Sequence, residues 1–74
     1  MTNPAEIIQG LHDSEINGGL TWLYDGAWHV WLGTDADSPE AAANVSSLRE
    51  AAEWLRVKAV EHYPDSEFAE MYRS

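Results

Sequence analysis

The sequence contains no cysteine and very few basic residues. Without cysteine the chain cannot form a disulfide, hold an Fe–S cluster or bind zinc through thiolates. Four Lys and Arg residues stand against 13 Asp and Glu residues, which gives a formal net charge of −9 over 74 residues. A protein that binds nucleic acid directly needs a basic surface to displace counterions from the phosphates, so this balance argues against that class.

Long hydrophobic runs are also lacking. No apolar stretch approaches the roughly 18–20 residues that span a bilayer, and the first residues lack the basic region of a signal peptide. We therefore expect no membrane partner and a location in the reducing cytoplasm. The length fits one domain, which we expect to span residues 1–74.

The aromatic residues are the main resource for a core. Four Trp, three Tyr and one Phe are present, and each can bury about 150–250 Å². A first helix is expected from Asn3, which can cap it, and from Pro4, which suits the first helical position. Asn17-Gly18-Gly19 ends this helix, after a frayed last turn around residues 13–15.

Residues 20–32 predict a β-hairpin, because Asp25-Gly26 separates two runs of aromatic and β-branched residues. Two registers compete. A two-residue loop uses Asp25-Gly26 alone, whereas a three-residue loop adds Tyr24 and places Gly26 in the left-handed position of a G1 bulge. We favour the second, because it separates the faces better. It puts on one face Leu20, Trp22, Trp28, Val30 and Leu32, and on the other Thr21, Leu23, Ala27, His29 and Trp31.

The C-terminal half predicts a possible edge strand and two helices. Residues 41–45 form a weak apolar stretch, and Ser47 to Glu50 is a capping box that starts a long helix. The buried face of that helix is expected to hold Leu48, Ala51, Ala52, Leu55, Ala59 and His62. We expect Trp22 and Trp28 to fill the space that its alanines leave. Tyr63-Pro64 stops this helix, and Asp65 caps a terminal helix with Phe68, Met71 and Tyr72 on one face.

These elements predict an α+β domain of order α-β-β-(β)-α-α, with helices on one face of a small antiparallel sheet. The order superficially resembles that of the double-stranded-RNA-binding domain. That family grips phosphate with a basic second helix, whereas the corresponding helix here begins Ser47-Leu48-Arg49-Glu50-Ala51-Ala52-Glu53. RNA binding is therefore not expected.

Motifs for metal binding or catalysis are weak. His12 and Glu15 are one helical turn apart, but a di-iron site needs further inward-facing Glu residues. Asp35, Asp37 and Glu40 resemble the start of a calcium loop, yet Pro39 and Ser46 stand where ligands are required. We find no nucleophile motif and no phosphate-binding glycine loop. We therefore expect no enzymatic activity, no cofactor and no metal.

The distribution of charge points to a surface function. Residues 1–48 hold seven acidic and no basic residues, whereas residues 49–74 hold six acidic and four basic ones. Acidic residues alone can serve solubility. A field of one sign also steers a protein toward a basic partner. The candidate contact residues are Asp13, Glu15, Asp25, Asp35, Asp37 and Glu40.

Small size, acidic charge, absence of cysteine and absence of a catalytic motif together resemble the phage-encoded anti-CRISPR proteins of the nucleic-acid-mimic kind. The resemblance covers the overall character of the chain and no diagnostic motif. It implies binding to the DNA-binding surface of a Cas surveillance complex, with type I complexes preferred, in the cytoplasm of the host cell. It implies contact with a basic protein surface and none with nucleic acid itself.

Aromatic side chains give an alternative function. Leu23 and Trp31 on the outer face of the hairpin, and Trp54 off the main stripe of the long helix, are candidate contact residues. They favour a small adaptor or a homodimeric interaction domain. Trp31 is equally compatible with cover by the first or the last helix, so both a monomer and a homodimer stay open.

Overall fold

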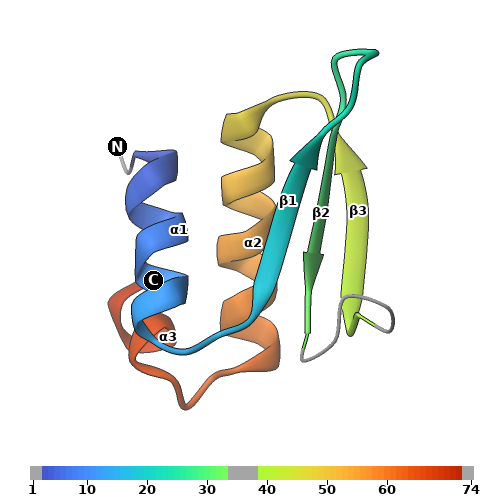
Figure 1. Cartoon of the computed structure of the whole chain (residues 1–74). Coiled ribbons are helices and arrows are strands. Elements are labelled where there is room, and N and C mark those ends of the chain that lie inside the picture. The colour runs from blue at the N-terminus through green and yellow to red at the C-terminus, as the bar shows by residue number, and fades with distance from the viewer. Residues whose placement is uncertain (1–2, 34–38, 73–74) are drawn as a thin grey trace.

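The computed structural model describes residues 3–33 and 39–72, and it confirms the α+β class (Figure 1). The structure contains α1 (Pro4–Asp13), β1 (Gly18–Trp22), β2 (Trp28–Leu32), β3 (Ala41–Val45), α2 (Leu48–His62) and α3 (Glu67–Tyr72). The possible third strand is therefore formed. The first helix ends at Asp13, with Ser14 as its C-cap, so of the frayed turn expected at residues 13–15 only Asp13 belongs to the helix.

The three strands form one antiparallel sheet in the order β1-β2-β3. Trp22 pairs with Trp28, which confirms the three-residue loop of the hairpin. The Leu23 amide donates to the Ala27 carbonyl at 2.8 Å, and the Gly26 amide donates to the Leu23 carbonyl at 3.1 Å. Gly26 has a φ of 93°, in the left-handed region that glycine adopts without steric cost.

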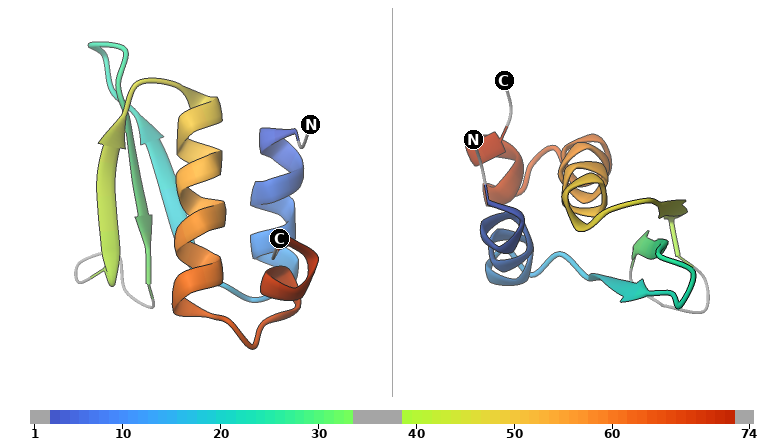
Figure 2. Two further views of the ribbon diagram at one scale, coloured as in Figure 1. Left: turned by 180° about the vertical axis from the view of Figure 1, so that it is seen from behind. Right: turned by 90° about the horizontal axis from the view of Figure 1, so that it is seen from above.

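The long helix α2 lies at the centre of the molecule. It packs on β2 and β3 with one side, while α1 and α3 pack against its other side (Figure 2). Its predicted face of small residues is buried at Ala51, Ala52, Leu55 and Ala59. Because alanine has no side chain beyond Cβ, neighbouring elements can approach the axis of α2 closely.

Phe68 on α3 anchors the second interface of α2. It is completely buried, and its ring stacks on Tyr72 with 4.5 Å between centroids. On α1, Gly10 gives this ring room, since a Cβ atom there would lie 3.3 Å from it. The terminal helix is thus held by one large apolar side chain in the common core.

Capping explains where the helices begin. Asn3 accepts a hydrogen bond from the Ala5 amide at 2.8 Å, as predicted. The Ser47 hydroxyl accepts from the Glu50 amide at 3.1 Å, while the Glu50 carboxylate accepts from the backbone amide and the hydroxyl of Ser46. These bonds from Ser46, the backbone amide first, lower the pKa of Glu50. As predicted, α2 ends before the Tyr63-Pro64 pair.

Four predictions for the C-terminal part are wrong. Leu48, expected on the buried face of α2, is exposed at the first position of the helix. The hydroxyl of Ser66, and not Asp65, accepts a hydrogen bond from the Ala69 amide at 3.1 Å and so caps α3. Met71 is 71% exposed, because the inward face of this short helix is set by Phe68 and its neighbour Ala69. His62 is exposed, since the buried stripe of α2 ends one turn earlier at Ala59.

The expectation that Trp22 fills space beside the alanines of α2 is also wrong. Trp22 is 73% exposed, while Trp28 is half-buried. Through the strand pairs, Trp22 lies level with Trp28 and with Val45, the last residue of β3. Trp22 therefore lies at the end of the sheet from which the chain leaves to start α2 three residues later.

Phe68→Ala is expected to lower the free energy of unfolding by about 3–5 kcal/mol, because it leaves a cavity in the common core. The control is Met71→Ala in the same helix, which removes an exposed side chain and should change stability by less than about 0.5 kcal/mol. Urea denaturation monitored by circular dichroism measures both. Equal effects of the two substitutions would contradict this packing.

Candidate functional site

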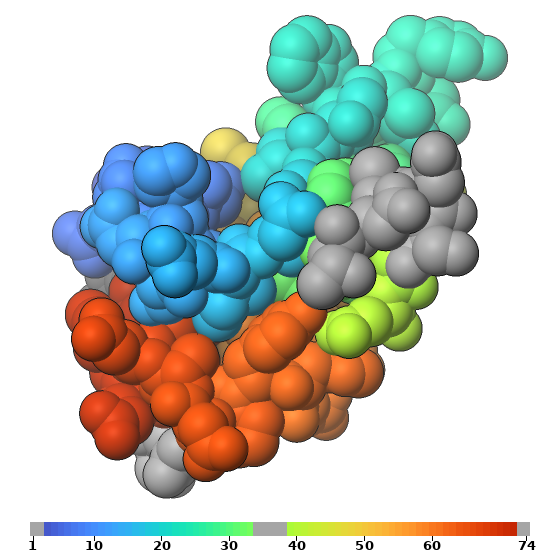
Figure 3. Space-filling view, turned by 60° about the horizontal axis from the view of Figure 1, so that its bottom comes forward, coloured from blue at the N-terminus to red at the C-terminus, as the bar shows by residue number. Residues whose placement is uncertain are grey.

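Five exposed carboxylates lie toward one end of the molecule. Because α1, the strands and α2 alternate in direction, the end of α1, the start of β3 and the end of α2 share this end, at the bottom of Figure 1 and brought forward in Figure 3. We call it the acidic end. Its residues are Asp13, Glu15, Glu40, Glu61 and Asp65.

The acidic end holds three of the six predicted acidic contact residues, Asp13, Glu15 and Glu40. Asp25 lies at the opposite end, in the hairpin loop, where its carboxylate accepts a hydrogen bond from the Ala27 amide at 3.1 Å and so helps to form the turn. Asp35 and Asp37 lie outside the described residues. Glu61 and Asp65 are not among the predicted contact residues. Their position at this end depends on the length and direction of α2, which the charge pattern alone does not give.

Two of these carboxylates have defined polar neighbours on their own helix. Asp13 accepts a hydrogen bond from the Gln9 amide group at 3.0 Å and lies 3.6 Å from the His12 ring. Glu61 forms an ion pair with Lys58 at 3.3 Å. His12 thus contacts Asp13, its neighbour in sequence.

Glu40 is tied to the end of α2. The Tyr63 hydroxyl donates to its carboxylate at 2.9 Å, across 23 residues of sequence. Partial burial of the phenol raises the pKa of Tyr63, and the bond to Glu40 raises it further. This bond fixes the start of β3 against the C-terminal end of α2.

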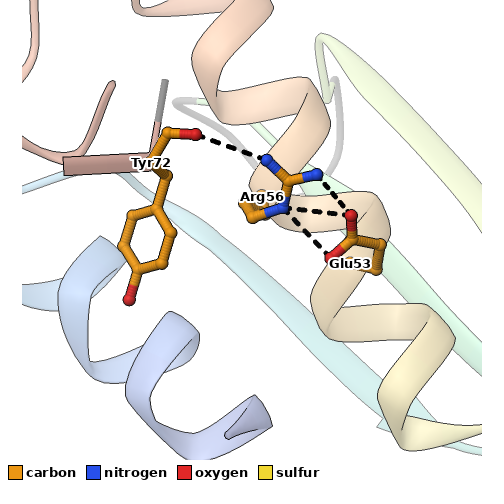
Figure 4. A network of polar contacts seen from close by, with 3 residues as sticks. All are labelled: Glu53, Arg56 and Tyr72. Carbon is orange, nitrogen blue, oxygen red and sulfur yellow. Dashed lines mark hydrogen bonds and ion pairs between the residues drawn. The ribbon is translucent and has the colours of Figure 1, made fainter. Parts of the chain in front are cut away.

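Arg56 of α2 forms polar contacts within α2 and with α3. The Arg56 guanidinium grips both carboxylate oxygens of Glu53 and also donates to the Tyr72 carbonyl at 3.4 Å (Figure 4). Hydrogen bonding to Arg56 lowers the pKa of Glu53, and the same bond raises that of Arg56. This cluster links α2 to the end of α3. Because Glu53 is paired with Arg56, it contributes little uncompensated negative charge.

A shallow hollow lies at the opposite end, between the hairpin loop and the start of α2. Asp25 and Glu50 line it with Gly26, Ala27, Asn44, Val45 and Ser46. Glu50 is already engaged by Ser46 as part of the helix cap. The two carboxylates therefore have separate structural tasks, in the turn and in the cap.

The predicted apolar contact residues are less exposed than Trp22 and Tyr24. They are Leu23, Trp31 and Trp54. Trp31 lies on the face of the sheet turned away from α2, across Gly19, where a Cβ atom would be 2.5 Å from its indole nitrogen. It is half-buried, and so is Trp54, which packs against the core. Leu23 is only moderately exposed at the start of the loop.

The large exposed aromatic side chains are instead Trp22 and Tyr24. The alternation of faces along the hairpin does not reveal their exposure. The two-residue connection Ser46-Ser47 carried a usable signal. It requires α2 to start close to the last residue of β3, and therefore level with Trp22.

A further feature, not expected from the sequence, is an apolar cleft of about 290 Å³ between α1 and β1. We call it the α1–β1 groove. Its walls and floor are formed by Ile8, Leu11, His12, Ile16, Asn17, Gly18, Gly19, Leu20, Leu32 and Leu55. The groove exists because α1 packs on α2 and β1 lies at the edge of the sheet.

Within residues 3–33 and 39–72, no three His, Asp or Glu side chains converge as a metal site would require. In the same residues no helix combines the length and the apolar character needed to cross a membrane. The chain matches no family model, and comparisons with curated proteins and with solved structures find no similar protein.

Tyr63→Phe is expected to reduce the loss of stability at alkaline pH. The phenol binds its proton more tightly in the folded than in the unfolded state, so this contribution is complete below about pH 10 and is lost as the pH rises through the folded pKa. Unfolding by urea between about pH 9 and 11 measures the dependence. Tyr24→Phe, at a fully exposed position, is the control and should behave as the wild type. Identical slopes for Tyr63→Phe and the wild type would contradict the role of this bond.

Proposed function

We propose that the protein is a non-enzymatic acidic binding protein that occludes a basic, nucleic-acid-binding surface of a protein partner. An anti-CRISPR inhibitor of a Cas surveillance complex would act in this way, in the cytoplasm of the host cell. The observation that carries the proposal is the acidic end, where three segments distant in sequence contribute exposed carboxylates.

The placement of the carboxylates suits this function better than a uniform negative charge. Their anchor points are the ends of α1, α2 and β3, and Tyr63 holds Glu40 in position at 2.9 Å. Carboxylates held on such a frame can take the positions that phosphates would occupy in a basic groove. They pay less conformational entropy on binding than a flexible acidic tail would.

Electrostatics then governs the encounter with the partner. Net charge −9 creates a long-range negative potential, and such a potential raises association rates with a basic surface. Lys58 and Arg56 are each paired with a Glu of α2, so their charges are locally balanced. We therefore expect binding that weakens strongly as salt is added.

The test compares two variants of equal net charge. Glu15→Gln with Asp65→Asn removes two charges from the acidic end, whereas Glu6→Gln with Asp25→Asn removes two from elsewhere. Glu40 and Glu50 are left intact because each accepts a structural hydrogen bond, and Asp25→Asn keeps the side-chain oxygen that can accept from the Ala27 amide. Fluorescence anisotropy of labelled target DNA measures how well each protein prevents binding by a purified type I Cas surveillance complex.

The acidic-end variant is expected to inhibit about 2- to 30-fold more weakly than the wild type, as loss of two surface ion pairs implies. The control variant should stay close to the wild type, and all inhibition should fall with salt. Equal weakening in both variants would show that only bulk charge matters. Absence of inhibition by the wild type would reject this partner.

A further inference from the structure

The free edge of β1 has no protection against strand pairing. Hydrogen-bonded positions alternate along an antiparallel pair, and the bonds Leu23 to Ala27 and Gly33 to Asn17 fix the phase. The backbone groups of Gly18, Leu20 and Trp22 therefore point away from β2. Natural edge strands are usually blunted by Lys, Pro or a bulge, but β1 has neither residue, and its register with β2 is continuous.

The same strand is the place where two acidic copies can approach each other. Residues 16–24 form a nine-residue stretch without a charged side chain in a chain of net charge −9. Two apolar features are formed with residues of this stretch. One is the exposed indole of Trp22, and the other is the α1–β1 groove, which borders Gly18.

A symmetric pairing brings these two features together. We propose that two copies of the chain associate through antiparallel β1–β1 pairing centred on Leu20, with Trp22 of each copy in the α1–β1 groove of the other. This register uses all three outward-pointing residues and places Trp22 opposite Gly18 of the second copy. Gly18, Leu20 and Trp22 face the helix side of the sheet, because they pair with Leu32, Val30 and Trp28.

The groove suits an indole in chemistry and in position. Ile8 and Leu11 form its α1 wall, Leu32 and Leu55 its floor, and the opposite residue, Gly18, has no side chain to block entry. Two indoles bury about 300–500 Å² together, and the groove walls lose a similar area. The total falls near or below the roughly 1,200 Å² at the lower limit of stable interfaces, so the dimer should be weak and concentration-dependent.

Like charges limit the dimer. In this register Glu15 of one copy lies level with Asp25 of the other, five positions from the centre on either side, and both are exposed. Added salt screens this repulsion and that between the net charges. Self-association should therefore strengthen with salt, whereas binding to a basic partner should weaken.

Sedimentation equilibrium from about 10 μM to 1 mM protein, in about 0.05 M and 0.5 M salt, tests the proposal. Trp22→Ala should raise the dimer dissociation constant at least about 30-fold, as expected for a central Trp. Ile8→Ala, on the groove wall, should also raise it. Because the two side chains touch in the dimer, the combined variant should lose less than the sum of the single effects.

The matched control is Tyr24→Ala, which removes an even more exposed aromatic side chain that lies outside β1. It should change the dissociation constant less than about 3-fold, and circular dichroism verifies that each variant is folded. A strict monomer over the whole range would overturn the proposal, as would a dimer that is indifferent to Trp22→Ala or that weakens with salt. Each of these three results would leave the acidic-end test unaffected.

Discussion

The structure depends on the packing of two different layers against the two sides of α2. Alanines at positions 51, 52 and 59 keep this helix narrow, so that a sheet and a pair of helices can both bury their apolar faces on it. In a chain of 74 residues this arrangement lets both layers share one small core around α2. Phe68 and Leu32, both essentially fully buried, come from the two layers that α2 separates.

The same packing determines what stays uncovered. Since α2 packs on β2 and β3 and carries α1 on its other side, a groove is left between α1 and the edge strand β1. The short Ser46-Ser47 connection sets the start of α2 level with the end of the sheet, where Trp22 is exposed. The groove and the exposed Trp are thus consequences of one constraint on the placement of α2.

The fold was largely predictable because its signals are local. Asp25-Gly26 with Tyr24 defines the hairpin loop, Ser47 and Glu50 cap α2, and Pro64 ends it. The predictions were wrong where two neighbouring residues can serve the same role or where parts distant in sequence meet. Both Asp65 and Ser66 can cap a helix, and the exposure of Trp22 depends on where a helix 26 residues later begins.

The candidate site was predictable in composition but not in shape. Excess acid is visible in the sequence, yet the grouping of Asp13, Glu15 and Glu40 with Glu61 and Asp65 follows from the alternating directions of the elements. Asp25, which the charge pattern of the sequence placed among the same contact residues, lies at the other end of the molecule. Trp31 lies across Gly19 because strand register brings the two residues opposite each other.

Residue-resolved amide hydrogen exchange at low and high protein concentration tests most directly whether the edge of β1 is an association surface. Since Leu20 and Trp22 donate toward the uncovered edge of β1, we predict that their amides exchange rapidly in dilute solution and become protected on concentration. The Thr21 amide points toward His29 on β2 and should be protected in both. Concentration-independent exchange at Leu20 and Trp22 would contradict the claim that the edge left uncovered by α2 is an association surface.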